Sequence, residues 1–160
     1  MGPMTTTHAA KPLSIVLDHV RKPSNLGAVL RVAAGLGARL VLTGSSADRH
    51  RRASRFAAVG LEELVPIEVF ETLDEAARAL RTEGYSLIGT SPRAQKTHWE
   101  LDVTGPVALV FGNEVGGLSQ AKLESLEQVV RIPLAQGVES LNLAVAVGIV
   151  GYEVARRGQR

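Results

Sequence analysis

Apolar residues in this 160-residue chain gather in short runs that alternate with longer amphipathic stretches. The runs are rich in Val, Ile and Leu, and they have the length and composition of strands buried on both faces. Turn residues such as Gly, Pro and Asn follow most of them. The pattern predicts six strands, at residues 13–18, 39–43, 64–70, 85–90, 107–111 and 129–132.

The stretches between the runs carry apolar residues at helical spacing. The first predicted helix has Asn25 as a plausible N-cap and ends at Gly35 or Gly37. Four more predicted helices cover residues 49–58, 73–81 (capped by Thr72 and stopped by Gly84), 119–126 (capped by Ser119) and 141–157. Because strands alternate with helices, we predict an α/β fold with a mainly parallel sheet and helices on both faces.

Composition excludes several classes of protein. Hydrophobic residues make up 45% of the chain and aromatic residues only 4%, so the core must consist of Val, Leu, Ile and Ala. The chain has no cysteine, which excludes a disulfide framework, a zinc–thiolate site and a cysteine nucleophile. No metal-ligand spacing, membrane span or signal peptide is visible. We therefore expect a cytoplasmic protein without membrane or metal, with a disordered tail at residues 1–11 and one domain at 12–160.

The basic residues are 14 Arg and only 4 Lys. Arginine binds phosphate through two parallel hydrogen bonds and stacks on bases, which suits nucleic acid. One cluster comprises Arg49, Arg51, Arg52 and Arg55, and a second one, residues 156–160, ends the chain. Codon bias or a solvated helix face would explain such runs equally simply. Two clusters in so short a chain make nucleic acid a hypothesis to test, with Arg49, Arg51, Arg52 and Arg55 as the surface predicted to bind it.

Three predicted strands end in segments rich in Gly, Asn and charged residues, namely 18–31, 107–119 and 132–142. Ligands of α/β proteins bind beyond the carboxyl ends of strands, so the three segments predict one composite site. A plain glycine turn would be the simplest explanation of residues 112–117, and an ion pair at the edge of the core that of Arg31. The dinucleotide fingerprint and the Walker A sequence are both absent, which makes NAD and ATP poor candidates as cofactors.

Together the three segments resemble motifs 1, 2 and 3 of the SpoU–TrmH class of SPOUT RNA methyltransferases. The matching residues are Asn25-x-Gly27-x-x-x-Arg31 for motif 1, Phe111-Gly112-Asn113-Glu114-x-x-Gly117-Leu118 for motif 2, and Ile132-Pro133-Leu134 with Ser140-Leu141-Asn142 for motif 3. The resemblance extends from Leu13 to Tyr152. It departs from the class at Ala144, where many members carry Ser.

The resemblance implies an α/β fold with a deep trefoil knot near the C-terminus. It implies S-adenosylmethionine as cofactor, bound mostly through backbone groups of Thr90, Gly112, Ile132, Leu134 and Leu141. The implied reaction is methyl transfer to a ribose 2′-hydroxyl of RNA, with tRNA favoured over rRNA because small stand-alone members of the class often act there. The implied assembly is a homodimer in which the motif 1 arginine reaches the cofactor of the other subunit.

The resemblance also implies a role for each polar residue of the three motifs. Arg31 acts either as the base proposed for the class or, because guanidinium stays protonated in proteins, as a clamp for the alkoxide and the 3′ phosphate. Asn25 orients Arg31 or the ribose, and Glu114 fixes Arg31. Ser140 and Asn142 order the motif 3 loop.

Two other functions remain open from the sequence. A knotted RNA-binding or assembly protein without catalysis would share the fold, although the complete set of polar motif residues disfavours it. A nicotinamide-dependent oxidoreductase is disfavoured by the missing fingerprint.

Changing Arg49, Arg51 and Arg52 together to Gln is expected to weaken RNA binding and to flatten its dependence on salt. Each lost phosphate contact should lower the slope of log K against log salt by about 0.7 to 0.9. Binding titrations at several salt concentrations measure that slope, and calorimetry with S-adenosylmethionine serves as the control. An unchanged slope would move RNA binding to residues 156–160 or elsewhere.

Overall fold

A computed structural model describes residues 12–46 and 60–158 of the chain. The predicted tail at residues 1–11, the predicted basic helix at 49–58 and the four arginines Arg49, Arg51, Arg52 and Arg55 lie outside the described residues. The description that follows concerns the two ranges alone.

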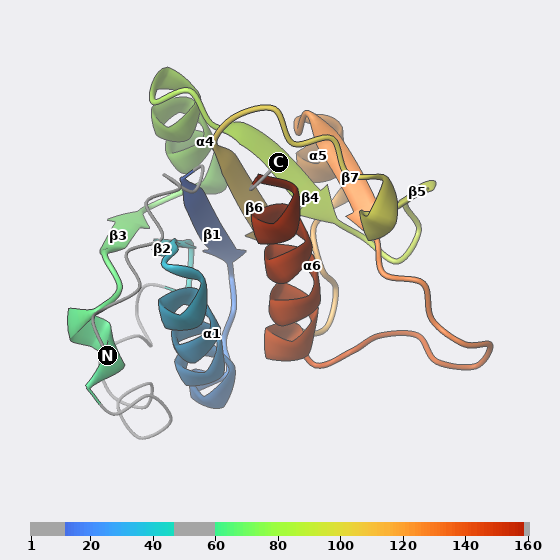
Figure 1. Cartoon of the computed structure of the whole chain (residues 1–160). Helices are drawn as coiled ribbons and strands as arrows, with labels where there is room; N and C mark the ends of the chain where they lie inside the picture. Colours follow the sequence, from blue (N-terminus) through green and yellow to red (C-terminus); the bar gives the residue numbers. More distant parts are fainter. Residues whose placement is uncertain (1–11, 47–59, 159–160) are drawn as a thin grey trace, which may run out of the picture.

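Seven strands form one sheet in the order β3-β2-β1-β6-β4-β7-β5, and all six strand pairings between them are parallel (Figure 1). Their bounds are β1 Leu13–Asp18, β2 Arg39–Thr43, β3 Ile67–Phe70, β4 Ser86–Thr90, β5 Lys96–Thr97, β6 Val107–Phe111 and β7 Gln128–Arg131. This confirms the predicted parallel α/β sheet. The predicted trefoil knot stays a prediction.

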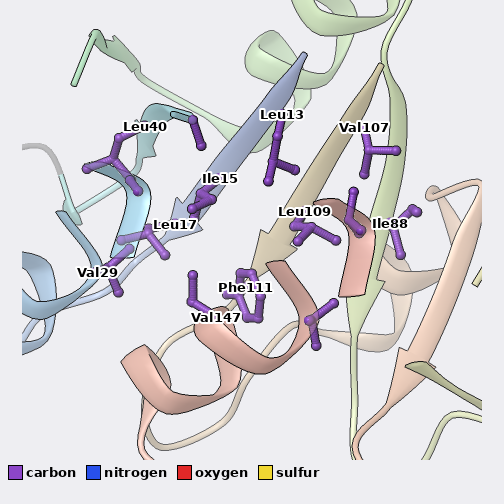
Figure 2. Packing of buried hydrophobic residues seen from close by; sticks show 14 of the residues in the cluster. Leu13, Ile15, Leu17, Val29, Leu40, Ile88, Val107, Leu109, Phe111 and Val147 are labelled. Atoms are coloured by element: carbon purple, nitrogen blue, oxygen red, sulfur yellow. The ribbon is translucent and has the colours of Figure 1, made fainter. Parts of the chain in front are cut away.

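The central strands are buried on both faces, as their continuous apolar sequences predict. In β1, Ile15 and Leu17 belong to the core on one side of the sheet, whereas Val16 belongs to the core on the other side. The alternation follows from the two-residue period of a strand. Figure 2 shows the first core, in which Phe111 of β6 and Val147 of the last helix lie among aliphatic side chains.

Within the described ranges, four α-helices cover the two faces of the sheet (Figure 1). On one face, α1 (Pro23–Leu36) lies beside α6 (Leu143–Gly158), and both contribute to the first core. On the other, α4 (Leu73–Thr82) and α5 (Gln120–Glu124) contribute to the second core. The structure confirms two of the three predicted side-chain caps, because Thr72 accepts from the N–H of Glu75 and Ser119 accepts from that of Lys122.

The structure corrects several boundaries. Asn25 is not the N-cap of α1, because the helix begins at Pro23 and Lys22 occupies the cap position without a side-chain hydrogen bond. The strand predicted at residues 64–70 starts only at Ile67 and follows a 3₁₀ turn, η1 (Leu61–Glu63). Between β4 and β6 the chain forms β5 and a second 3₁₀ turn, η2 (His98–Glu100), neither of which the sequence pattern predicts. The last helix starts at Leu143 and not at residue 141.

The topology determines where a site can form. In a parallel sheet all strands end at the same edge, so the segments that follow β1, β4, β6 and β7 leave the sheet close together. Strands β2 and β3 lie on one side of β1, and β4 to β7 lie on the other side. The strand order therefore reverses between β1 and β6. None of the helices in the described ranges is both long and apolar enough to span a membrane.

Candidate active site

A cavity of about 740 Å³ lies at the carboxyl ends of β4, β6 and β7. Three segments far apart in the sequence line it, and they are the three motif segments predicted from the sequence. The segment after β1 contributes Asn25, the segment after β6 contributes Glu114, and the segment before α6 contributes Ser140 and Asn142. The three segments that were predicted to form one composite site therefore lie together around one cavity.

Glu114 binds the motif 1 segment through three hydrogen bonds. Its carboxylate accepts from the backbone N–H groups of Arg21 and Lys22 at 3.3 and 3.0 Å, and from the Asn25 side-chain amide at 3.0 Å. Partial burial raises the pKa of Glu114, but the hydrogen bonds from Asn25 and the backbone outweigh it and hold that pKa below its usual value. Glu114 is therefore an ionised acceptor with a structural task, and it is a poor proton acceptor for a substrate.

Asn25 connects Glu114 to the third motif segment. Its side chain is buried, because only 7% of the residue is exposed. The Nδ2 group donates to Glu114, so the Oδ1 atom faces the other way and accepts from Nδ2 of Asn142 at 3.3 Å. The predicted cap role of Asn25 is wrong because its two polar atoms are engaged by residues distant in sequence.

Asn142 occupies the position of N-cap for α6. Its Oδ1 atom accepts from the backbone N–H groups of Ala144 and Val145 at 2.9 and 3.4 Å. Because this oxygen is committed to the helix, the Nδ2 group must point toward Asn25. The chain of hydrogen bonds Asn142–Asn25–Glu114 thus has one fixed direction, and it joins the three motif segments.

The motif 2 segment is a tight turn that approaches its own backbone. Asn113 accepts through Oδ1 from the N–H groups of Val115 and Gly116 at 3.0 and 2.7 Å. A Cβ atom at Gly112 would lie 2.2 Å from the carbonyl carbon of Gly117 and 2.4 Å from the nitrogen of Leu118. No other residue fits at position 112 without moving this turn, which carries Glu114.

A partly buried ion pair lies at the end of β1, next to the motif 1 segment. Asp18, at the end of β1, accepts from Nζ of Lys122 at 2.6 Å and from the Thr43 hydroxyl at 2.7 Å. The next residue, His19, has a φ of 55°, and its Nδ1 atom lies 3.1 Å from the Ser45 hydroxyl. This corner turns the chain so that the N–H groups of residues 21 and 22 face Glu114.

All five residues predicted to bind the cofactor line the cavity, namely Thr90, Gly112, Ile132, Leu134 and Leu141. Arg31 is the exception among the predicted site residues, because it is exposed on α1 and does not line the cavity of its own chain. The predicted contact between Glu114 and Arg31 stays a prediction.

Sequence reasoning missed other residues of the wall, among them Ser91 and Pro92 after β4 and Arg131 at the end of β7. The sheet topology explains their position, because each lies at the end of a strand, next to a residue that was predicted to line the site. Within the described ranges, no group of three or more His, Asp or Glu side chains is placed to hold a metal ion.

Comparison with known proteins agrees with this geometry. The sequence model of the SpoU rRNA Methylase family matches residues 12–152, which include all three motif segments. The chain belongs to this family. It is 41% identical over 156 residues to a 23S rRNA (guanosine-2'-O-)-methyltransferase RlmB from Burkholderia sp, covering 94% of this chain and 62% of that relative. The chain thus spans about three fifths of the length of that curated relative.

Solved structures of the family superpose closely on the chain. An AdoMet-bound rRNA methyltransferase from Sinorhizobium meliloti has a TM-score of 0.84 and 31% identity, over 91% of this chain and 56% of that one. A structure from work on the 2-OH methylation of C/U34 on tRNA also has a TM-score of 0.84, with 30% identity over 92% of this chain and 97% of that one.

Two variants of Asn142 should separate its two hydrogen-bonding tasks. Asn142→Asp keeps an oxygen at the N-terminus of α6, where a negative charge is favourable. It loses the Nδ2 group that donates to Oδ1 of Asn25. Asn142→Ala loses both tasks and should cost about 0.5–2 kcal/mol of stability. We expect a near-normal melting temperature for the Asp variant alone, and altered NMR signals of the Asn25 side-chain amide in both. Unchanged Asn25 signals in the Asp variant would contradict the fixed direction of the network.

Proposed function

We propose that this chain is an S-adenosylmethionine-dependent RNA methyltransferase that acts on a ribose 2′-hydroxyl. The observation that carries the proposal is the convergence of the three family motifs on one cavity, where the Asn142–Asn25–Glu114 network joins them. The Burkholderia relative is named for guanosine 2'-O methylation, and the Sinorhizobium structure holds AdoMet.

The cavity suits a ligand of the size and mixed polarity of S-adenosylmethionine. Its volume lies within the range of about 300–1,000 Å³ that is usual for small-molecule sites. Ile132, Leu134 and Leu141 offer apolar side chains and backbone groups, and Thr90 and Gly112 lie at the ends of the two neighbouring strands. We assign cofactor binding to these five residues. When bound, the cofactor supplies a methyl group that its sulfonium already activates.

The residues of the chain would then orient and polarise the hydroxyl group. Ser140 and Asn142 line the cavity just before α6, where the dipole of that helix favours negative charge. Glu114 keeps Asn25 in place, as its three hydrogen bonds and lowered pKa indicate. Orientation of this kind can supply a large share of the rate when the reacting group is already activated.

Arg31 is assigned to a site completed by a second copy of the chain. It lies one helical turn before Gly35, where a Cβ atom would be 3.0 Å from the Tyr152 hydroxyl of α6. Arg31 therefore borders the side of α1 that faces α6, at a place exposed in one copy. From there its protonated guanidinium can reach into the cavity of a partner, stabilise an alkoxide and hold a phosphate.

A stripe of exposed apolar residues on α6 supports the homodimer. Val145, Ile149 and Tyr152 recur at helical spacing and are 50%, 36% and 56% exposed. At least half of Val145 and of Tyr152 is exposed, although α6 packs against the sheet through Val147, Val150 and Val154. A second copy covering this stripe and the adjoining side of α1 would bury it and bring Arg31 to the partner.

We favour tRNA over rRNA as the substrate. The similarity that supports this preference is to the structure from work on the 2-OH methylation of C/U34 on tRNA, which has a TM-score of 0.84 and 30% identity. Radiolabelled methyl transfer to total tRNA and to rRNA tests the activity and the preference together, and mapping the 2′-O-methyl groups lost on gene deletion identifies the nucleotide. Absence of S-adenosylmethionine binding in calorimetry would favour a non-catalytic RNA-binding protein instead.

Arg31→Ala is expected to abolish methyl transfer while S-adenosylmethionine affinity changes by no more than a few fold, because Arg31 does not line the cavity of its own chain. Turnover assays and calorimetry measure the two quantities. Arg78→Ala is the matched control, since Arg78 is an exposed arginine of α4 on the opposite face. Near-normal turnover of the Arg31 variant would remove Arg31 from the mechanism.

Replacing Val145 and Ile149 together by Asp is expected to yield monomers that no longer methylate RNA. Charges on the stripe would oppose burial against a partner, while exposure in the single chain makes them tolerable for folding. Sedimentation at micromolar concentration reports the mass, with Val69→Asp on the exposed edge strand β3 as control. A monomer that still methylates RNA would contradict the proposed dimer.

A further inference from the structure

Trp99, the only tryptophan of the chain, is 61% exposed. It lies in η2, immediately after the edge strand β5. A single exposed apolar residue needs no functional explanation by itself. Three further properties distinguish the segment formed by β5 and η2. Its backbone is held by hydrogen bonds, cationic side chains lie around it, and it lies beside the candidate active site.

The turn that carries Trp99 is fixed at both ends. Thr97 and Glu100 form a capping box, in which the Thr97 N–H and hydroxyl both donate to the Glu100 carboxylate, at 2.8 and 3.1 Å. The two neighbours of this pair in the turn, His98 and Leu101, are buried. The His98 ring lies 5.1 Å from that of Trp99, centroid to centroid. The backbone that carries the indole is therefore already ordered before a ligand binds, which lowers the entropy cost of binding.

Cationic side chains surround the same turn. The Arg157 guanidinium of α6 donates to the Trp99 carbonyl oxygen and to Glu153, which Arg156 also contacts. Hydrogen bonds from Thr97 are the main cause that lowers the pKa of Glu100, and the charges of Lys96 and Arg131 lower it as well. The groups linked by these contacts comprise four cations (Lys96, Arg131, Arg156, Arg157) and two carboxylates (Glu100, Glu153).

Sheet register connects this segment to the cavity. Thr97 of β5 is paired with Arg131 of β7, and Arg131 lines the cavity. The turn at Trp99 therefore begins one residue beyond a position that adjoins the cavity wall. If one unit of a polymeric ligand occupied the cavity, a neighbouring unit of the same polymer would lie close to Trp99.

We propose that Trp99 is a stacking platform for an unpaired RNA base that neighbours the nucleotide held in the cavity. This rests on the proposed function. A rigid aromatic face takes up any base by stacking, and the adjacent Arg and Lys side chains contact the flanking phosphates. The excess of cations favours a polyanion over a protein partner, and the continuity with the cavity favours the substrate RNA itself.

The single tryptophan makes its fluorescence a direct reporter of this contact. We expect a single-stranded oligo(A) RNA of about 12 nucleotides to quench the emission and a duplex of equal length to quench it much less. Anisotropy of the same RNA carrying a label measures binding independently. Binding without quenching would overturn the proposal, and so would emission that changes on dilution of the protein without RNA, because Trp99 would then lie between copies of the chain.

Substitutions separate stacking from general surface effects. Trp99→Leu should weaken oligo(A) binding by about five- to a hundredfold, whereas Trp99→Phe, which can still stack, should retain most of it. Val69→Ala, an exposed apolar position on the far edge of the sheet, is the matched control and should leave binding unchanged. Equal binding by the Leu and Phe variants would overturn the stacking role.

Calorimetry with S-adenosylmethionine on the same variants keeps the two proposals apart. Intact cofactor binding and methyl transfer with no effect of Trp99→Leu on RNA affinity would refute the platform alone. Loss of quenching by RNA in a wild-type protein that also fails to bind the cofactor would count against both. Quenching without cofactor binding would support the platform and refute the methyltransferase.

Discussion

Three N–H groups from the segment after β1 converge on one carboxylate from the segment after β6, and the geometry of the site depends on that convergence. An ionised carboxylate partly withdrawn from water must be supplied with donors, or its burial would be costly. Because Asn25 provides one of them with its Nδ2 group, the orientation of the Asn25 amide is determined. That orientation in turn selects the Nδ2 group of Asn142, whose oxygen is held by α6. One charge thereby sets the direction of every hydrogen bond in the chain of contacts.

The parallel sheet makes this arrangement possible, and its most regular part was also the part that could be predicted. Strands β1, β2 and β6 match the sequence prediction to the residue, because each contains a run of at least three apolar residues that is buried on both faces of the sheet. Strand β3 was predicted too long, since Pro66 lacks the N–H group that an extension of the ladder would need. Strand β5 was missed because two residues are too few to show a period.

The site was predicted well where residues stand directly at strand ends and poorly where their partners are distant. Nine of the ten residues predicted for catalysis and cofactor binding line the cavity, and Arg31 is the tenth. Asn25 before a helical pattern has the local sequence signature of a cap, and nothing in its neighbourhood indicates that Glu114 and Asn142 would take up its polar atoms instead. Local propensity describes what a residue can do alone, and long-range partners decide what it does.

The polar network also bears on the order in which the molecule can fold. Its two central hydrogen bonds join residues 89 and 117 positions apart in the sequence. Contacts between residues so far apart in sequence contribute to stability only once most of the chain has collapsed, because closing the long loop between them costs conformational entropy. During synthesis Asn142 is made long after the strands β1, β2 and β6 are complete. A nascent chain can therefore contain strands β1, β2 and β6 before Asn142 exists, and the Asn142–Asn25–Glu114 network is complete only when the last helix docks.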